Sequence, residues 1–573
     1  MSQAPTAAPE PPPGATSDAP RAGARPVGRR SRWGGPPRLG PRGALAAFLA
    51  GAVLASVLST WPIPGPFPPP ATALLRPATD VLLGAGLVLA LGPRLPRGLP
   101  TLLAAVLVVG RLLRIGDALM ITYFGRTVTL YLDVALVPEL GRLLADTLGA
   151  ALAVWTGFGI AAGVVALIAL GGRWLALGRR LGGRERLGIL GGLAVLGLVQ
   201  AGAGTAGGED AGVLAPSALP RLAEEVDFLL HVHGLREETR AVFAEARERL
   251  EAAPKNLDGL ADTDVYLLFV ESYGTTVWED PDHLARFRPA QERLATTARE
   301  AGYAVRSGAL VSPTFGGASW LAHGTVASGV PLTTQLRFDL LVTSDLEPLA
   351  RHLRRAGHHT VELMPGTKRP FPEGRWFGFE DHLYQWHFGY RGPRYDWAPM
   401  PDQLVLDTLL RRFVRDRSDP RPLFAEVVLV SSHAPFRRQP PYVEDWSRLG
   451  DGSVFRELDT VRFEVPFPDM TRAGPAYVAS IAYVLRCVGG FLERLPRERP
   501  AVVFVLGDHQ PNPQITGPGA PFTVPMHVLS RQEDLVEAFG RVAGLEPGWD
   551  PGDPAAARGM ARFPTDMLEA YSR

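Results

Sequence analysis

Four apolar, β-branched runs in the second half of the chain end at side chains that can bind a metal ion or a phosphate group. The runs and the residues that follow them are VYLLFV with Glu271, VVLVSS with His433, VVFVLG with Asp508 and His509, and TVELM with a loop that carries Lys368 and Arg369. Open parallel sheets place their functional groups at the carboxyl ends of the strands. The repeated placement of acids and histidines at such ends indicates a metal-dependent α/β enzyme.

Glu271, Asp508 and His509 are the candidate metal ligands. Carboxylate oxygens and imidazole nitrogens together suit Mn²⁺, Mg²⁺ or Zn²⁺. Each candidate has a structural alternative. Glu271 can be an acid at a helix start that backbone N–H groups stabilise, and Asp508 with His509 can be a salt-bridged turn. The sequence predicts one divalent metal ion as the cofactor.

Ser319 is the candidate nucleophile. It stands in FGGASWLAH, where two glycines lead into a serine and then into helix-compatible residues. A hydroxyl at a helix start lies at the positive end of the helix dipole. It can be an N-cap without chemistry, or a nucleophile whose alkoxide a metal stabilises. Ser312 and Thr314 are competing hydroxyls, but neither directly follows the glycine turn.

Four further residues are candidates for substrate binding. His433 can bond a phosphate oxygen, protonate a leaving group, or be a loop histidine that faces solvent. His323 lies four residues after Ser319 on the same helix face, where it either contacts substrate or caps a polar edge. Lys368 and Arg375 lie in one stretch, 364–386, in which the pair Lys368 and Arg369 suits phosphate, although solvated surface charges explain that pair equally well.

The carboxyl-terminal half alternates short apolar runs with helical or loop stretches. This alternation predicts an α/β domain over 263–573, with a mostly parallel central sheet flanked by helices. The runs are nearly continuous in apolar residues, as expected for strands covered on both faces. The tail after about residue 550 is weakly patterned and is expected to be peripheral. Cys487, the one cysteine, lies in an amphipathic segment and is expected in the core rather than as a nucleophile.

The amino-terminal half predicts a membrane anchor. Residues 1–42 are rich in Pro, Ala, Gly and Arg and are expected to be a disordered basic cytoplasmic segment. Residues 43–208 are expected to form a membrane domain of about five helices, since about 20 residues span a bilayer. The apolar stretches are 43–61, 78–92, 99–116, 147–170 and 187–208. Residues 209–262 are expected to form a juxtamembrane helical linker.

The placement of arginines predicts the topology. Basic clusters precede the first apolar stretch, separate the second from the third, and separate the fourth from the fifth. With five spans every cluster falls on one side, which the positive-inside rule makes cytoplasmic. The chain is therefore expected in the cell (inner) membrane, with a cytoplasmic amino terminus and an extracytoplasmic catalytic domain. A signal peptide is the alternative for the first stretch.

The order of four motifs resembles a known pattern. The motifs are VES at 270–272, GG-x-S-W at 316–320, S-H-x-P-F at 432–436 and G-D-H at 507–509. From about residue 264 to 530 the chain resembles the sulfatase-like branch of the alkaline phosphatase superfamily. The likeness is greatest to membrane-anchored lipoteichoic acid synthases, phosphoglycerol transferases and phosphoethanolamine transferases.

The resemblance implies an alkaline-phosphatase-like fold and assigns roles to five residues. It implies that Glu271, Asp508 and His509 hold a divalent metal, with Ser319 as the hydroxyl nucleophile bound to it. It also implies that His433 contacts the phosphoryl group of the substrate.

Three departures from the family pattern limit what the resemblance implies. The nucleophile of the lipoteichoic acid branch is usually threonine, and serine here preserves the hydroxyl. The chain lacks the C/S-x-P-x-R motif of arylsulfatases, so hydrolysis of sulfate esters is not expected. The stretch 364–386 lacks the His-Gly-Asp loop and the Trp-x-Arg motif of relatives that handle phosphoglycerol. The identity of the headgroup therefore stays open.

These features together predict a metal-dependent phosphotransferase that works through a covalent phospho-serine intermediate. It would move a headgroup, phosphoglycerol or phosphoethanolamine, from a membrane phospholipid to an extracytoplasmic glycan or polymer. The net charge of +1 gives no reason to expect a nucleic acid partner. Two alternatives stay open: a sulfatase-like phosphodiesterase or hydrolase acting on a phospho- or sulfo-ester, and a non-catalytic membrane scaffold with a degenerate site.

Overall fold

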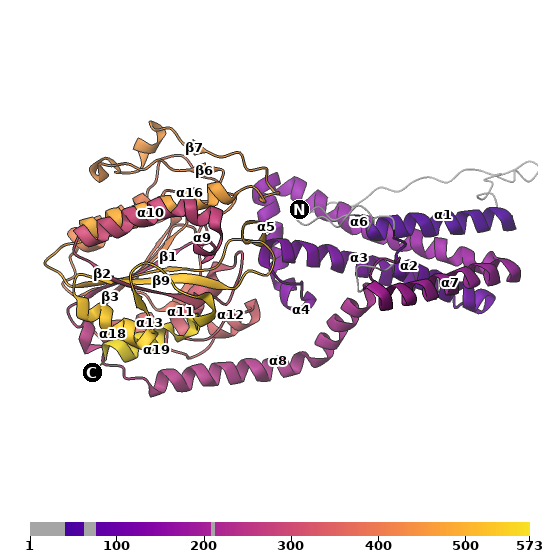
Figure 1. The fold of residues 1–573 in the computed structure, drawn as a ribbon, viewed down its shortest axis with the longest axis horizontal. Coiled ribbons are helices and arrows are strands. Elements are labelled where there is room, and N and C mark those ends of the chain that lie inside the picture. Colours follow the sequence, from indigo (N-terminus) through magenta and orange to yellow (C-terminus); the bar gives the residue numbers. More distant parts are fainter. Residues whose placement is uncertain (1–39, 62–75, 208–212, 573) are drawn as a thin grey trace, which may run out of the picture.

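The computed structural model describes residues 40–61, 76–207 and 213–572. An amino-terminal helical part with apolar helices precedes a carboxyl-terminal α/β part (Figure 1). The predicted disordered segment 1–42 lies almost entirely outside the described residues, as does the start of the predicted linker.

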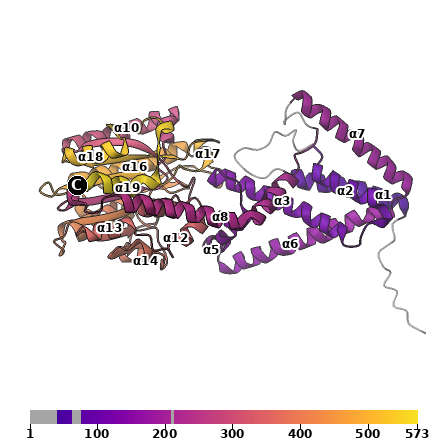
Figure 2. The same cartoon turned by 90° about the horizontal axis from the view of Figure 1, so that it is seen from below.

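Among the described residues, five longer helices make up most of the amino-terminal part, and Figure 2 shows their arrangement. They are α1 (Pro41–Thr60), α2 (Thr79–Leu91), α3 (Leu99–Phe124), α6 (Ala150–Ala176) and α7 (Gly183–Gly207), with the shorter α4 (Leu130–Asp133) and α5 (Val137–Leu148) between α3 and α6. Large apolar side chains point outward, including Trp155 (71% exposed) and Phe158 (66% exposed) on α6. Such exposure fits contact with lipid rather than water.

Four helices in the described part of the chain are long and apolar enough to cross a membrane. Three of them precede the α/β part: Pro41–Thr60, Ala150–Arg180 and Gly183–Gly202. Because α2 has 13 residues and α3 carries Arg111, Arg114 and Asp117, the arrangement with five spans stays a prediction.

The fourth apolar helix, α16 (Gly474–Arg494), belongs to the core of the α/β part. Its apolar window is 78% buried inside the protein. Cys487 on this helix is fully buried, which confirms its predicted core position. Length and apolarity alone therefore do not separate this core helix from a membrane span.

The α/β part is built on a mostly parallel mixed sheet, as predicted. Its strands run in the order β10-β2-β9-β8-β1-β5-β3-β4, and β11 pairs with β2. The strands β8, β1, β5, β3 and β4 are mutually parallel, whereas β9 is antiparallel to both β8 and β2. Their bounds are β1 (Asp264–Val270), β2 (Ala304–Val311), β3 (His359–Met364), β4 (Asp381–Tyr384), β5 (Leu423–Leu429), β8 (Ala501–Gly507), β9 (Thr523–Ser530), β10 (Glu546–Pro547) and β11 (Arg558–Gly559). A separate ribbon pairs β6 (Arg438–Gln439) with β7 (Val461–Arg462).

Helices cover both faces of this sheet (Figure 1), which explains the continuous apolar runs. Successive residues of β1 point to opposite faces, so Tyr266 and Leu268 lie in one core and Leu267 and Phe269 in the other. The first core contains α10 (Pro281–Glu300), α15 (Asp402–Leu409) and α16. The second contains α11 (Ser319–Ser328), α12 (Gln335–Leu341), α13 (Leu349–Arg355), α14 (Gly374–Phe377), α18 (Glu533–Ala543) and α19 (Phe563–Tyr571). The short helices α9 (Thr276–Glu279) and α17 (Pro513–Thr516) follow β1 and β8.

The tail after residue 550 is not peripheral, so that prediction was wrong. Phe563, Met567, Leu568 and Tyr571 on α19 are almost fully buried in the second core. The helix has only nine residues, so its apolar positions are too few to show a clear period.

The helix α8 (Leu219–Ala252) connects the two parts and runs along one side of the molecule (Figure 1). Its last turns pack on the second core through Ala246 and Leu250. Arg337 on α12 pairs with Glu238 at 2.9 Å, and Arg249 donates to the Gly329 carbonyl at 2.8 Å. The end of α8 is therefore attached to the α/β part.

Register brings the carboxyl ends of three strands to one level. Val270 at the end of β1 pairs with Leu429 of β5 and with Gly507 of β8. The residues that follow these strands are therefore delivered to one edge of the sheet.

At the opposite end of β1, Asp264 is expected to be the main polar anchor of the strand. Its carboxylate is 2% exposed. It accepts hydrogen bonds from the Leu423 N–H at 2.8 Å and from the Arg417 guanidinium at 3.2 Å. Asp264→Asn should lower the free energy of unfolding by about 3 kcal/mol, because it leaves Arg417 without its buried partner. Denaturant titration of the detergent-solubilised chain, followed by tryptophan fluorescence, measures this change. The half-exposed acid Asp451 provides the control, and a loss from Asp451→Asn as large as that from Asp264→Asn would contradict the assignment.

Candidate metal centre and nucleophile

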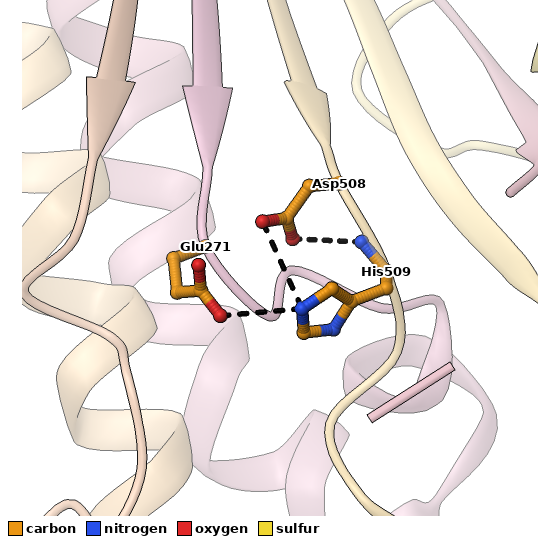
Figure 3. Close-up of side chains that lie close together, drawn as sticks. All are labelled: Glu271, Asp508 and His509. Atoms are coloured by element: carbon orange, nitrogen blue, oxygen red, sulfur yellow. Dashed lines mark hydrogen bonds and ion pairs between the residues drawn. The ribbon is translucent and has the colours of Figure 1, made fainter. Parts of the chain in front are cut away.

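Glu271, Asp508 and His509 form one buried cluster at the carboxyl edge of the sheet. They offer ligand atoms that all lie within 4.8 Å of one another, and this is the one such group of three found among the described residues. His509 Nε2 lies 3.2 Å from Glu271 Oε1 and 3.8 Å from Asp508 Oδ2 (Figure 3). The three residues follow two adjacent strands, β1 and β8.

Backbone and hydroxyl groups hold the two carboxylate residues in place. The Ser272 N–H donates to Asp508 Oδ1 at 2.8 Å, and the Ser432 hydroxyl donates to the Glu271 carbonyl at 2.6 Å. Ser272 has a φ of +58°, a region that L-residues seldom adopt. This turn lets the chain leave β1 while its N–H group points at the neighbouring carboxylate.

The orientation of His509 fits metal binding. Its Nδ1 lies 2.7 Å from the Gln510 carbonyl oxygen, which can only accept a hydrogen bond. Nδ1 therefore carries the proton, and in the neutral ring Nε2 presents its lone pair to the two carboxylates. Hydrogen bonding of the distal nitrogen to a backbone carbonyl is a common way to orient a metal-binding imidazole.

The two carboxylates dominate the electrostatics of the cluster. Burial and the neighbouring Glu271 charge raise the pKa of Asp508 to about 7. Burial lowers the pKa of His509, but Asp508 and Glu271 together outweigh it and bring that pKa to about 9. Burial also opposes ionisation of Glu271, yet the positive charge of His509 holds the pKa of Glu271 below the usual value. The two carboxylates thus stabilise positive charge at the centre of the cluster.

The residues present fit a divalent metal. Asp508 Oδ2 is buried and accepts no hydrogen bond from any described residue, which is costly for a carboxylate oxygen unless a cation binds it. Two carboxylates, an imidazole nitrogen and an adjacent hydroxyl make a mixed oxygen and nitrogen donor set of the kind that binds Mn²⁺, Mg²⁺ or Zn²⁺. A buried Glu, Asp and His cluster that can hold a metal is thus present, as predicted.

Ser319 joins this cluster rather than capping its helix. Its hydroxyl donates to Glu271 Oε2 at 3.0 Å and lies 3.2 Å from His509 Nε2. The residue at the N-cap position of α11 is Ala318, with φ of +61°, and no side chain caps the helix. The alternative of a purely structural N-cap is therefore wrong, and the hydroxyl sits among the metal-ligand candidates.

The two competing hydroxyls serve the loops around the cluster. The Ser312 hydroxyl donates to the Asp508 carbonyl at 2.6 Å, and the Thr314 hydroxyl donates to the Gly317 carbonyl at 2.6 Å. Both stabilise the backbone that carries Asp508 and Ser319. Of the three candidate hydroxyls, Ser319 is therefore the one that faces the cluster.

Trp397, which sequence analysis did not find, links His433 to Lys368. Its indole stacks on the His433 imidazole with centroids 4.1 Å apart and planes 12° apart, and Lys368 Nζ lies 4.6 Å from its ring centroid. A Cβ atom on Gly366 would lie 2.8 Å from this ring, so glycine allows the Lys368 loop to approach. A single tryptophan in an irregular loop leaves no periodic signal in the sequence.

His433 is neutral in this arrangement. Its Nδ1 lies 2.7 Å from the Ala434 carbonyl oxygen, so Nδ1 carries the proton and Nε2 is the free nitrogen. Burial is the main cause that lowers its pKa. His433 therefore presents a proton acceptor at the carboxyl end of β5.

The other two predicted residues lie in different settings. His323 is 4% exposed and packs against Phe269, with the ring centroids 4.3 Å apart. Burial lowers the pKa of His323 to about 4. Neither of its ring nitrogens has a hydrogen-bond partner among the described residues. Arg375 has an exposed side chain on α14, with no hydrogen bond or ion pair to the cluster within the described chain. Their roles in substrate binding stay predictions.

Solved structures match part of this chain at low sequence identity. Solved structures that match include the lipoteichoic acid synthase LtaP from Listeria monocytogenes (14% identity, 57% of this chain and 81% of that chain, TM-score 0.35). Another is the phosphoglycerol transferase GacH from Streptococcus pyogenes in complex with sn-glycerol-1-phosphate (13% identity, 58% of this chain and 91% of that chain, TM-score 0.35). A third is the C-terminal periplasmic domain of EcEptC from Escherichia coli in complex with Zn (13% identity, 54% of this chain and 86% of that chain, TM-score 0.32). No protein-family model and no curated protein matches the chain. Similarity this low leaves the functional argument to the site itself.

Asp508→Asn is expected to abolish metal binding. In the unmodified chain, addition of Mn²⁺ should raise the melting temperature, because the ion binds the native state alone. The variant should lose this rise while its metal-free melting temperature is unchanged or higher, since repulsion from Glu271 is relieved. Glu426→Gln, which removes another buried carboxylate of the sheet, is the matched control and should keep the rise. A metal-induced rise that persists in Asp508→Asn would contradict the site.

Metal affinity is expected to increase with pH. The pKa of Asp508 is raised to about 7 and that of His509 to about 9, so protons compete with the ion below these values and leave as pH rises. The apparent affinity for Mn²⁺, measured from the free ion by electron paramagnetic resonance, should therefore rise between pH of about 6 and about 9. A flat profile over this range would show that the ion binds elsewhere.

Proposed function

We propose that the chain is a membrane-anchored, metal-dependent phosphotransferase. It moves a phospholipid headgroup, phosphoglycerol or phosphoethanolamine, to an extracytoplasmic glycan or polymer through a phospho-serine intermediate. The observation that carries the proposal is the Ser319 hydroxyl, which bonds to Glu271 at 3.0 Å and lies 3.2 Å from His509 Nε2. A hydroxyl nucleophile set against a buried metal-ligand cluster is the arrangement that phosphoryl transfer through a covalent intermediate needs.

A divalent metal held by Glu271, Asp508, His509 and Ser319 would favour the serine alkoxide and neutralise charge on the phosphodiester. The chain itself supplies orientation. Glu271 accepts the hydrogen bond of Ser319, and the fold at Ala318 points the hydroxyl toward the cluster. The start of α11 also places backbone N–H groups close to the site, where they favour a phosphate group.

The reaction balances as two displacements at phosphorus. In the first, a bond forms between Ser319 Oγ and phosphorus while the bond from phosphorus to the diacylglycerol oxygen breaks. Ser319 loses one proton and the diacylglycerol oxygen gains one. In the second, a hydroxyl of the acceptor attacks phosphorus, the bond to Oγ breaks, and Ser319 regains a proton that the acceptor loses.

His433 is the proposed carrier of these protons. Its neutral ring leaves Nε2 as an acceptor, and once protonated it can give the proton to the diacylglycerol oxygen. Trp397 holds the ring by stacking, and Lys368 on the same indole brings positive charge toward the headgroup phosphate. These contacts support an assignment of the region around Trp397 to the headgroup.

The amino-terminal helices support a lipid donor. A phospholipid in the same bilayer would be held near the catalytic domain and present at a high effective concentration. In this proposal the amino terminus is cytoplasmic, the catalytic domain lies outside the cell (inner) membrane, and no nucleic acid takes part.

Ser319→Ala is expected to abolish covalent adduct formation and turnover. After exposure of the unmodified chain to total membrane lipid, mass spectrometry of the Ser319 peptide should show an added headgroup phosphate. Ser319→Thr should retain part of the adduct because it keeps the hydroxyl.

His433→Gln should slow adduct formation by about 10²-fold or more while it keeps Mn²⁺ binding.

Three outcomes decide between the proposal and its rivals. A Ser319→Ala chain that keeps full turnover would exclude the nucleophile. Labelled headgroup released only to water, with none on an added glycan, would favour a phosphodiesterase that uses the same residues. A chain with no stoichiometric metal and no turnover would favour the scaffold.

A further inference from the structure

The end of α3 lies against the loop that carries the nucleophile. A Cβ atom on Gly316 would lie 1.9 Å from the Tyr123 carbonyl oxygen, and one on Gly317 would lie 3.1 Å from the Phe124 ring. Gly316 also has φ of +70°, which favours glycine. The backbone and ring at the end of α3 therefore occupy the space that side chains of this loop would fill.

The same helix end contacts the loop that follows the metal-ligand histidine. Past the end of α3, Gly125 packs between Phe315 and Pro513, to which a Cβ atom would lie at 3.4 and 3.8 Å. The Gly316 N–H donates to the Gln510 carbonyl at 3.1 Å. The nucleophile loop and the metal-ligand loop are thus bonded to each other and rest on one helix end.

Ion pairs hold this end of α3. Arg221 on α8 pairs with Asp117 of α3 at 3.1 Å and with Glu225 at 2.7 Å. The second oxygen of Asp117 accepts from the Val128 N–H at 2.9 Å. The side chains of Arg221, Asp117 and Glu225 are only 19, 14 and 4% exposed, so water screens these pairs less than it does at the surface. They fix the helix end as a support.

We propose that Tyr123 and Phe124 are positioning residues for Ser319. Through the backbone at Gly316 and the close contact at Gly317, they keep the Ser319 hydroxyl at its distance from Glu271 and His509. The inference rests on the proposed role of Ser319 as nucleophile. It makes the membrane domain part of the active-site architecture as well as an anchor, because a displacement of about 1 Å can slow a reaction about 10²-fold.

Phe124→Ala in the full-length chain tests the proposal. It should slow Ser319 adduct formation about 10-fold to 100-fold, equally for a vesicle-borne phospholipid and a soluble short-chain one. The KM for the donor and the affinity for Mn²⁺ should stay unchanged, since the sheet holds the metal ligands. Phe124→Tyr should restore the rate because it keeps the ring. Ile121→Ala, at an exposed position one turn earlier on α3, is the matched control and should leave the rate unchanged.

Hydrogen exchange of the peptide covering residues 312–319 gives a readout that does not depend on the reaction. Exchange should be faster in Phe124→Ala than in the unmodified chain and in Ile121→Ala. Equal protection in all three would overturn the inference, as would a rate loss confined to the vesicle-borne donor or shared by Ile121→Ala. Absence of an adduct in the unmodified chain would instead count against the proposed function, and the exchange result would still decide the role of Phe124.

Discussion

The parallel pairing of β1 with β8 brings two buried carboxylates, Glu271 and Asp508, to one edge of the sheet with a single imidazole between them. Like charges in a buried site repel strongly because little solvent screens them. Burial and this repulsion raise the pKa of Asp508, whereas attraction to the two carboxylates outweighs burial and raises the pKa of His509. The register of the sheet thus forms a buried cluster that can hold a cation, and the serine loop, the histidine loop and their supports are arranged around this cluster.

Backbone conformation at the site supports this interpretation. Among the described residues, non-glycine positive φ angles occur at Leu257, Ser272, Ala318, Asp396 and Phe436. Four of these five positions lie next to or within three residues of a site residue: Glu271, Ser319, Trp397 and His433. Such conformations disfavour folding unless the surrounding structure enforces them, and they concentrate where side chains must be aimed. The strain therefore falls at the loops that direct ligands and nucleophile rather than at random turns.

The two parts of the chain meet where the chemistry is expected. Glycines in the nucleophile loop give room to the end of α3, and α8 attaches both to α3 through Arg221 and to the α/β part through its last turns. A substrate carried by the bilayer and a candidate catalytic loop supported by α3 would belong to one design. In that design the amino-terminal helices contribute geometry as well as localisation.

The sequence by itself determined the four parallel strands β1, β3, β5 and β8, their two-sided burial and the ligand types, because apolar runs and the acids at their ends are local patterns. It identified Glu271, Asp508, His509 and Ser319, whose roles depend on residue type at strand and helix ends. Only the tertiary structure decided that Ser319 bonds to Glu271 instead of capping α11, that Trp397 stacks on His433, and that the tail is buried. The contacts of α3 with the nucleophile loop also lay beyond the sequence. These features depend on packing between segments far apart in the chain, and no local period or spacing records such distances.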